Sequence, residues 1–325
     1  MMERALQQYL VVTASYWAFT MTDGALRMLV VLFFHNLGYS PLEVATLFLL
    51  YEFFGIVTNL FGGWLAARVG LNVTMQIGLF LQIVSLAMLL VDQSMLSVVY
   101  VMVAQALSGI AKDLNKMSAK SSIKLLVPNN AQGRLYRWVA ILTGSKNTLK
   151  GIGFFLGGAL LAWLGFQGAV ALMAIALVMV LTLNGLLLDK NLGKTSYKPK
   201  FTEIFSKSAA VNRLSAARLF LFGSRDVWFV VALPVYLQSQ LDWHHMQVGM
   251  MMAAWVVGYG FVQTIAPKIT GVDRGKVPDG KTAFEWSVAL CLLPLVISGG
   301  LYFNFAAEYV LIGGLLIFGA VFAVN

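Results

Sequence analysis

Two apolar stretches of this sequence are interrupted by charged residues. In YWAFTMTDGALRMLVVLFFH, Asp23 and Arg27 lie one helical turn apart, and in the later stretch LFLFGSRDVWFVVALPVYL, Arg225 and Asp226 are adjacent. An ionisable group at the centre of a bilayer costs roughly 2.5 to 3.5 kcal/mol on insertion scales, so such groups usually face a cavity and mark a solute path. Two repeated halves around a midplane site are the general plan of secondary transporters. The pattern therefore predicts a transporter.

A pair of lysines in another apolar stretch favours an anionic solute. Lys146 and Lys150 are four residues apart, so one face of a helix would carry both. Counted from Trp138, Lys150 lies about 18 Å deep, near the middle of the membrane. Like charges on one face repel unless an anion or carboxylates neutralise them. The lysines therefore either contact an anionic substrate or pair with carboxylates of neighbouring helices. The candidate carboxylates are Asp23, Glu52 and Asp113.

The charged pairs can be given provisional roles. Asp23 and Arg27 either neutralise each other or serve substrate binding and proton coupling. Arg225 and Asp226 are adjacent and must point in different directions, so at least one of them reaches another partner. Arg225 is the expected anion contact of the second half, because its planar guanidinium suits phosphate or arsonate oxygens. Asp226 could take up a proton during transport.

Further polar residues join the candidate site. Asn147 lies between the two lysines, and Lys112 belongs to the polar run KDLNK at the inner end of an expected helix. Snorkelling to the cytoplasmic interface explains Lys116, at the end of this run, better than it explains Lys112 and Asp113. Glu52 is either a structural pairing carboxyl or a proton carrier. We predict Lys112 and Asn147 as substrate contacts and include Glu52 among the proton-coupling residues.

The composition excludes several classes of protein. Hydrophobic residues make up 59% of the chain and charged residues 11%, which is typical of an integral membrane protein. Cys291 is the only cysteine, so the chain can form no internal disulfide or multi-thiolate metal site. We expect no metal, no cofactor and no enzymatic activity, because no nucleophile and base are found together. The net charge of +9 comes mainly from short loops, where Lys and Arg indicate topology rather than nucleic-acid binding.

Apolar stretches of about 20 residues predict about ten membrane-spanning helices. They are expected at 9–35, 42–66, 73–92, 95–117, 137–163, 167–189, 215–238, 244–266, 283–303 and 307–325. Loops with and without Lys or Arg alternate along the chain, which predicts a cytoplasmic amino terminus. The glycines of GIGFFLGG, from Gly151 to Gly158, are expected to allow close helix packing.

The helices are expected to form two pseudo-repeated bundles. We predict an amino-terminal bundle at 1–188, a basic cytoplasmic linker at 189–213 and a carboxyl-terminal bundle at 214–325. The segments GIAKDLN and GAVFAVN, at 109–115 and 319–325, occupy comparable places in the two halves. This alignment predicts a plan of about twelve helices, of which the present chain would lack the last two.

One loop resembles the cytoplasmic signature of the major facilitator superfamily. The matching residues are Gly63, Arg68 and Gly70, whereas Ala67 stands where the family has an acid and Asn72 where basic residues are usual. The resemblance implies an all-α integral membrane protein with two pseudo-repeated helical bundles that move by alternating access.

At a finer level, nearly the whole chain is similar to the organoarsenical efflux permeases of bacterial arsenic-resistance operons. The segments that carry this similarity are TDGALRMLVVLFFHNLGYSP, LLYEFFGIVTNLFGGWLAARVGLN, AQALSGIAKDLNKMSAKSSIKLLVP, WVAILTGSKNTLKGIGFFLGG and LSAARLFLFGSRDVWFVVALPVYL. The resemblance implies export of 1-arseno-3-phosphoglycerate, which glyceraldehyde-3-phosphate dehydrogenase forms when it uses arsenate in place of phosphate. It also implies arsenate resistance, a place in the bacterial inner membrane and functional coupling to that dehydrogenase. We expect a monomer in the lipid bilayer.

The residues agree with this implication. A small solute with several negative charges needs buried cations, and Arg27, Lys146, Lys150 and Arg225 are predicted at membrane depth. The chain lacks the thiols that would suit trivalent arsenic. Proton-coupled export with Asp23 or Asp226 as the proton carrier is the expected mechanism. A permease for another organophosphate, organic anion or drug is the alternative within this architecture; a membrane receptor or a membrane-embedded enzyme is the alternative outside it.

Overall fold

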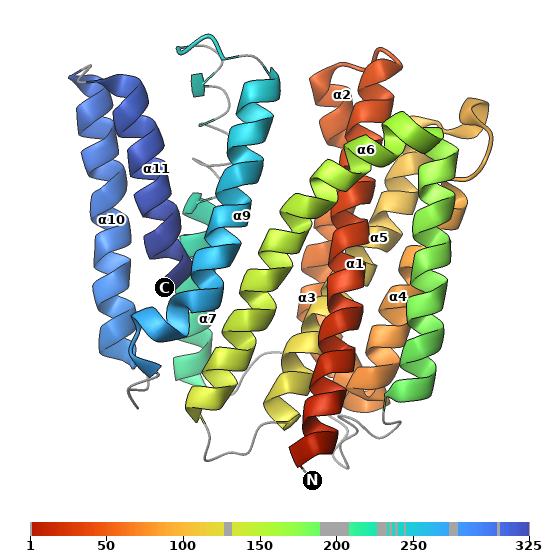
Figure 1. Ribbon diagram of the computed structural model, residues 1–325, viewed down its shortest axis with the longest axis horizontal. Helices are drawn as coiled ribbons and strands as arrows, with labels where there is room; N and C mark the ends of the chain where they lie inside the picture. The colour runs from red at the N-terminus through yellow and green to blue at the C-terminus, as the bar shows by residue number, and fades with distance from the viewer. Residues whose placement is uncertain are drawn as a thin grey trace.

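The structure is a computed structural model, and its description covers part of the chain. The described residues are 2–126, 132–188, 208–225, 233, 236–237, 240–243, 245–272, 279–303 and 306–324. Within these ranges the regular elements are helices and no strand occurs, as predicted. Figure 1 shows long helices that run roughly side by side, with α1 to α6 on one side and α7 to α11 on the other.

The first six predicted spans are found in the helices that precede the linker. They are α1 (Met2–Asn36), α2 (Pro41–Thr46), α3 (Leu49–Val69), α4 (Leu71–Met88), α5 (Val98–Leu126) and α6 (Gln132–Leu187), with a short 3₁₀ turn, η1 (Gln93–Met95), before α5. The long α6 contains Gly165 at φ +67°, a non-helical conformation that glycine adopts without steric cost. The chain reverses in this helix (Figure 1), so α6 holds both spans predicted at 137–163 and 167–189.

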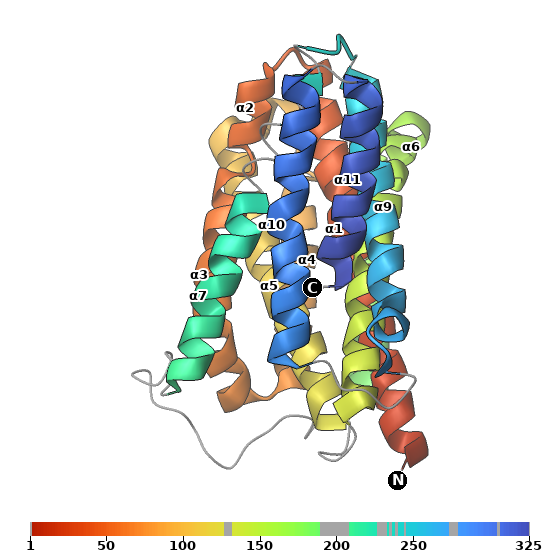
Figure 2. The ribbon, with the colours of Figure 1, turned by 90° about the vertical axis from the view of Figure 1, so that its left-hand side faces the viewer.

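The second part of the chain adds four helices in its described ranges. They are α7 (Ala209–Arg225), α9 (His245–Ile269), α10 (Gly280–Tyr302) and α11 (Ala307–Val324). Figure 2 shows these helices on the side that faces the viewer. The predicted linker at 189–213 lies largely outside the described residues, and α7 begins within its last part. The division into two bundles and a linker stays a prediction.

One predicted helix boundary was wrong. The helix expected to end near residue 117 continues as α5 to Leu126, so Lys120 and Lys124 lie on a helix and not in a loop. Lysine is a good helix former, and the segment from 112 to 126 contains neither glycine nor proline to end the helix.

The described helices fit a multi-pass membrane protein. Six of them are long and apolar enough to cross a membrane, or up to seven spans if the bent pair Glu43–Asn59 and Phe61–Val69 counts as one. The six stretches are Leu6–Asn36, Leu71–Met88, Gly133–Leu187, Met250–Ile269, Gly280–Tyr302 and Ala307–Val324. The α5 helix is not among them, because its carboxyl-terminal part is polar.

Close packing by glycine brings α1 and α6 together. A Cβ atom on Gly153 would lie 2.5 Å from the Met21 carbonyl oxygen, and one on Gly24 would lie 2.8 Å from the Lys150 carbonyl oxygen. Gly157 likewise contacts the backbone of Ala25. The predicted packing role of this glycine-rich segment is therefore confirmed for Gly153 and Gly157. These contacts fix Lys150 of α6 at the level of Gly24, beside the charged pair of α1.

Candidate functional site

Glu52 of α3 holds cations from two neighbouring helices. A terminal guanidinium nitrogen of Arg27, on α1, donates to Glu52 Oε1 over 2.8 Å, and Lys112 Nζ, on α5, lies 3.3 Å from Glu52 Oε2. The Glu52 side chain is 57% exposed, so the carboxylate is accessible while it holds both cations. Three residues far apart in the sequence thus meet at one place, as their predicted membership of one site requires.

The Tyr51 ring packs against both cations that Glu52 binds. Its ring centroid lies 4.5 Å from the Arg27 guanidinium carbon and 4.1 Å from Lys112 Nζ, distances typical of cation–π contacts. The Tyr51 hydroxyl donates to Asp23, with distances of 2.8 Å and 3.0 Å to the two carboxylate oxygens. Arg27 therefore pairs with Glu52, and the buried Asp23 receives its hydrogen bond from a tyrosine.

A second carboxylate, Asp113, is shared by lysines of its own helix. Lys116 Nζ lies 2.9 Å from Asp113 Oδ1, and Lys112 Nζ lies 3.9 Å from Asp113 Oδ2. The Asp113 side chain is only 2% exposed. Gly55 of α3 leaves the space that this carboxylate occupies, since a Cβ atom there would be 2.7 Å from Asp113 Oδ2. The paired charges continue from Glu52 along α5.

The α6 lysines differ from those of α5 in their contacts. Among the described residues, no carboxylate forms an ion pair with Lys146 or Lys150. Lys150 Nζ lies 5.7 Å from the Phe154 ring centroid. Lys146 is within Coulombic range of the α5 lysines, and Lys150 is within range of Arg27, so both belong to the same charged region. The carboxylates of Asp23 and Glu52 also lie within Coulombic range of Lys150. Both predicted roles of the lysines, anion contact and pairing with carboxylates, stay predictions.

Asn147 makes a contact that the sequence did not indicate. Its Nδ2 donates to Gln263 Oε1 of α9 over 2.8 Å, which joins the first half of the chain to the second. Close by, a Cβ atom on Gly260 would lie 2.5 Å from both the Gly144 carbonyl oxygen and Thr148 Oγ1. Asn147 was predicted as a substrate contact; in this structure its amide nitrogen is engaged between the halves.

Two predicted residues of the second half cannot be placed. Arg225 is the last residue of α7, and both its side chain and Asp226 lie outside the described part of the structure. Their expected roles in anion binding and proton transfer stay predictions.

The residues of the cytoplasmic signature have structural roles between α3 and α4. Gly70 adopts φ +96° at the junction of the two helices, and its backbone N–H donates to the Ala66 carbonyl oxygen. A residue with a side chain would be strained there. The Arg68 guanidinium lies 4.6 Å from the Trp64 ring centroid. Gly63 lies beside Met117 of α5, whose sulfur would be 4.0 Å from a Cβ atom at this position.

Sequence reasoning missed Tyr51. This residue is almost fully buried and contacts Arg27, Lys112 and Asp23, which makes it the centre of the charged site. Its position next to Glu52 in the sequence was the only available signal. That signal is weak, because adjacent residues of a helix point in different directions.

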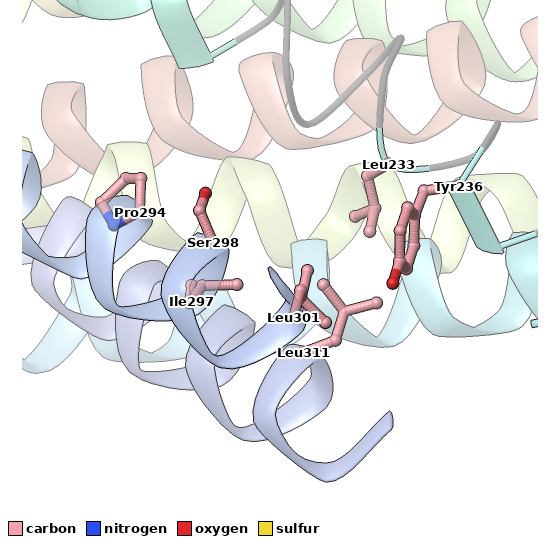
Figure 3. A pocket seen from close by; sticks show the side chains of 7 residues that line it. All are labelled: Leu233, Tyr236, Pro294, Ile297, Ser298, Leu301 and Leu311. Carbon is pink, nitrogen blue, oxygen red and sulfur yellow. The ribbon is translucent and has the colours of Figure 1, made fainter. Parts of the chain in front are cut away.

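The second half contains an apolar cavity of about 390 Å³. Figure 3 shows the side chains that line it, from α10, α11 and the described residues before α9. They are Leu233, Tyr236, Pro294, Ile297, Ser298, Leu301 and Leu311. The lining carries two hydroxyl groups and no charge, so this cavity differs in chemistry from the region around Tyr51.

An all-helical chain with membrane-length spans and a charged site between them defines a membrane transporter. The sequence matches the Major Facilitator Superfamily over residues 11–325, so the chain belongs to that superfamily. It is a secondary transporter and not an enzyme. The match extends across both halves of the chain and confirms the predicted fold class.

Solved structures with the same fold include three other transporters. The proton:xylose symporter XylE bound to 6-bromo-6-deoxy-D-glucose gives a TM-score of 0.67 at 16% identity, covering 99% of this chain and 80% of XylE. The human organic anion transporter MFSD10 (TETRAN) gives 0.69 at 15% identity, covering 98% and 83%. The peptide transporter POT in complex with sulfate gives 0.52 at 16% identity, covering 90% and 57%. No curated protein matches the sequence. At these identities the similarities show the fold alone.

Proposed function

We propose that this chain exports a small organic anion with several negative charges, and that the anion is 1-arseno-3-phosphoglycerate. The observation that carries the proposal is the pair Lys146 and Lys150, with which no described carboxylate forms an ion pair, beside Arg27 and Lys112. Unneutralised cations at membrane depth are costly unless the transported solute supplies the opposite charge. The site therefore suits an anion.

The carboxylates of the site argue against a cationic drug. Glu52 is engaged by Arg27 and Lys112, Asp113 by Lys116, and Asp23 by the Tyr51 hydroxyl. A cationic solute would have to displace these partners and would also meet the two α6 lysines. An anion can bind to Lys146 and Lys150 without breaking any of these contacts.

The choice of the organoarsenical rests on the sequence similarity to organoarsenical efflux permeases. Its phosphate and arsenate groups would both need cations, which Arg27, Lys112, Lys146 and Lys150 supply. Arg27 brings a planar guanidinium that can bind two oxygens of one such group. In this proposal the permease acts as a monomer in the bacterial inner membrane, with its amino terminus in the cytoplasm. It depends on glyceraldehyde-3-phosphate dehydrogenase for its substrate.

We further propose that export is coupled to protons. Asp23 is buried and lies close to the lysine and arginine side chains that would bind the substrate. It also accepts a hydrogen bond from Tyr51, so a change in its protonation would alter the site directly. Asp226 and Glu52 are the other candidates. Replacing Asp23 and Asp226 by Asn should abolish uphill export while the site still binds anions. Uphill export that survives both replacements would contradict proton coupling through these residues.

The proposal is tested in an arsenate-sensitive bacterium that expresses the permease with and without the dehydrogenase. Survival on arsenate and cell-associated arsenic are measured. We expect protection and lower retained arsenic only when both proteins are present, and loss of both effects in Lys146→Ala/Lys150→Ala. Lys281→Ala is the matched control, since Lys281 is exposed on α10 far along the chain. Wild-type protein that reaches the membrane and gives no protection would contradict the organoarsenical substrate.

A permease for another organophosphate is the second candidate, because the same cations would bind it. Uptake of 3-phosphoglycerate into inside-out membrane vesicles distinguishes the two. Dependence of that uptake on Lys146 and Lys150, without arsenate protection in cells, would favour the organophosphate.

A further inference from the structure

A ridge of lysines runs along α5 from the charged site to the end of the helix. The four residues are spaced four apart, and they are Lys112, Lys116, Lys120 and Lys124. Since α5 is continuous to Leu126, this ridge rises through about 18 Å of helix. The first three lysines are half-buried, with the Lys112 side chain 24% exposed and the Lys116 side chain 37% exposed, whereas Lys124 is exposed.

Positive charge is least neutralised in the outer part of the ridge. Lys112 and Lys116 are paired with Glu52 and Asp113. In the described ranges, Lys120 has no carboxylate partner. It is instead within Coulombic range of two further cations, Lys116 and Arg218, and Arg218 belongs to α7. One cation from each half, Lys116 and Arg218, is therefore close enough to act on this half-buried lysine.

The facing helix continues the same pattern. Lys146 of α6 is within Coulombic range of Lys112, Lys116 and Lys120. A helix surface that gathers like charges without neutralising them is unfavourable on its own. The arrangement is favourable when an anion lies between the two helices, because such an anion meets cations from both sides.

We propose that this ridge is the access path of the anion from the cytoplasm, and that Lys120 is the half-buried residue that captures it. A row of like charges along low-dielectric walls focuses the field and raises the local concentration of the opposite charge. From Lys120 the anion passes to Lys116 and Lys146, and then to the site around Lys112 and Lys150. The proposal rests on the proposed function for the charge of the solute, not for its identity.

Topology alone does not account for the ridge. Lysines at the cytoplasmic ends of spans orient membrane proteins, and long side chains can reach the interface from a short depth. This explains the exposed Lys124. It does not explain why Lys120 remains half-buried near three other cations.

The single cysteine of the chain makes a direct test possible. Cys291→Ser removes the only thiol, and Thr143→Cys then places a reporter on the face of α6 that carries Lys146 and Lys150. Inside-out vesicles are treated with anionic methanethiosulfonate ethylsulfonate or with its cationic ethyltrimethylammonium analogue. The ratio of the two reaction rates reports the local field and does not depend on the substrate. A second reporter, Val139→Cys, lies seven residues before Lys146 on the same face of α6 and is used if Thr143→Cys fails to insert.

We expect the anionic reagent to be favoured, and Lys120→Gln to lower the anionic-to-cationic ratio by about fivefold. Lys120→Arg should retain the ratio, Lys281→Gln should leave it unchanged, and added salt should lower it in the wild type. A ratio in Lys120→Gln equal to that in Lys281→Gln would overturn the proposal. If Lys120→Gln lowers the anionic-to-cationic ratio as expected but the wild-type protein gives no arsenate protection in cells, the access path stands and the proposed substrate is contradicted.

Discussion

The two halves of this transporter differ in the chemistry of their interiors. In the first half, α1, α3 and α5 place charged side chains around Tyr51. In the described part of the second half, the interior is aromatic and apolar. Trp255 stacks on Tyr259 with ring centroids 5.4 Å apart and donates from Nε1 to the Leu315 carbonyl oxygen. The ion pair between Lys281 and Glu285 is exposed.

This contrast suggests a division of labour. The charged half supplies the groups that recognise an anion. The apolar half supplies α9, which packs against α6. Their contact is made by small residues, Gly144 and Gly260, with Thr148 beside them. Small residues allow helix backbones to approach closely in a membrane, and they leave few interlocking side chains that would resist sliding of one helix against the other. We therefore expect substitutions in the two halves to impair transport for different reasons.

The largest effect is expected from the α6 lysines. Lys146→Ala and Lys150→Ala should each lower transport by about 30-fold or more, since loss of a charge contact in a desolvated site costs about 2–5 kcal/mol. Thermal stability should be unchanged or slightly raised, because two like charges no longer repel. Cell-associated arsenic in the arsenate-sensitive bacterium that also expresses the dehydrogenase measures transport, and unfolding in detergent measures stability. Equal losses in Lys281→Ala, in the second half, would refute the comparison.

The contact between the halves gives the next largest effect. Gly260→Ala should reduce transport about tenfold, because its Cβ atom would lie 2.5 Å from the Gly144 carbonyl oxygen and push α9 away from α6. Gly258→Ala on the same helix is the matched control, since its Cβ atom would meet nothing within 4 Å. Anion binding by the first half should persist in both variants. If Gly260→Ala abolished binding as well, the halves would share the site more evenly than we infer.

The sequence predicted the positions of the helices better than the contacts between their side chains. The lengths of the apolar runs located the spans of α1, α4 and α6, because crossing a bilayer requires about 20 apolar residues. The end of a span in a charged segment was located less well: the helix predicted at 95–117 continues as α5 to Leu126. Periodicity identifies a face of a helix, but a helix boundary inside a charged segment depends on packing that the pattern does not contain.

Partner choice in the site could not be read from spacing. Asp23 and Arg27 are one turn apart and might be expected to pair, yet Glu52 of another helix binds the arginine and Tyr51 binds the aspartate. Similarly, Asn147 lies between two substrate candidates in the sequence but bonds to Gln263, 116 residues away. These contacts depend on how helices are rotated against each other, which is decided by packing across the whole bundle.

A smaller effect is expected when a hydroxyl is removed in each half. Tyr51→Phe should destabilise the protein by about 1.5–3 kcal/mol, the usual cost of a hydrogen bond to a charged group, because the buried Asp23 loses its donor. Tyr236→Phe should be nearly neutral, since Tyr236 lines the apolar cavity and the described residues give its hydroxyl no partner. Denaturant unfolding in detergent compares the two. Similar losses of unfolding free energy would mean that the Tyr236 hydroxyl also makes a hydrogen bond of comparable strength.

The smallest effect should be the same in both halves. At Glu43, before α3, a hydrogen bond from the Ser40 backbone N–H and then one from its hydroxyl lower the carboxyl pKa; at Asp279, which caps α10, the Thr282 backbone N–H and hydroxyl do so. A depressed folded-state pKa stabilises above the unfolded value, and this gain is lost as the pH falls through the folded-state pKa. Glu43→Gln and Asp279→Asn should therefore each lower Tm at pH 7 by no more than about 2 °C. Below the depressed pKa values the difference from wild type should vanish. Scanning calorimetry at pH 7 and at the lowest pH that keeps the protein folded measures this difference. Glu285→Gln, an exposed change in the second turn of α10 that removes no cap, is the control. A loss that did not shrink with acid would show that shape, not charge, makes these caps effective.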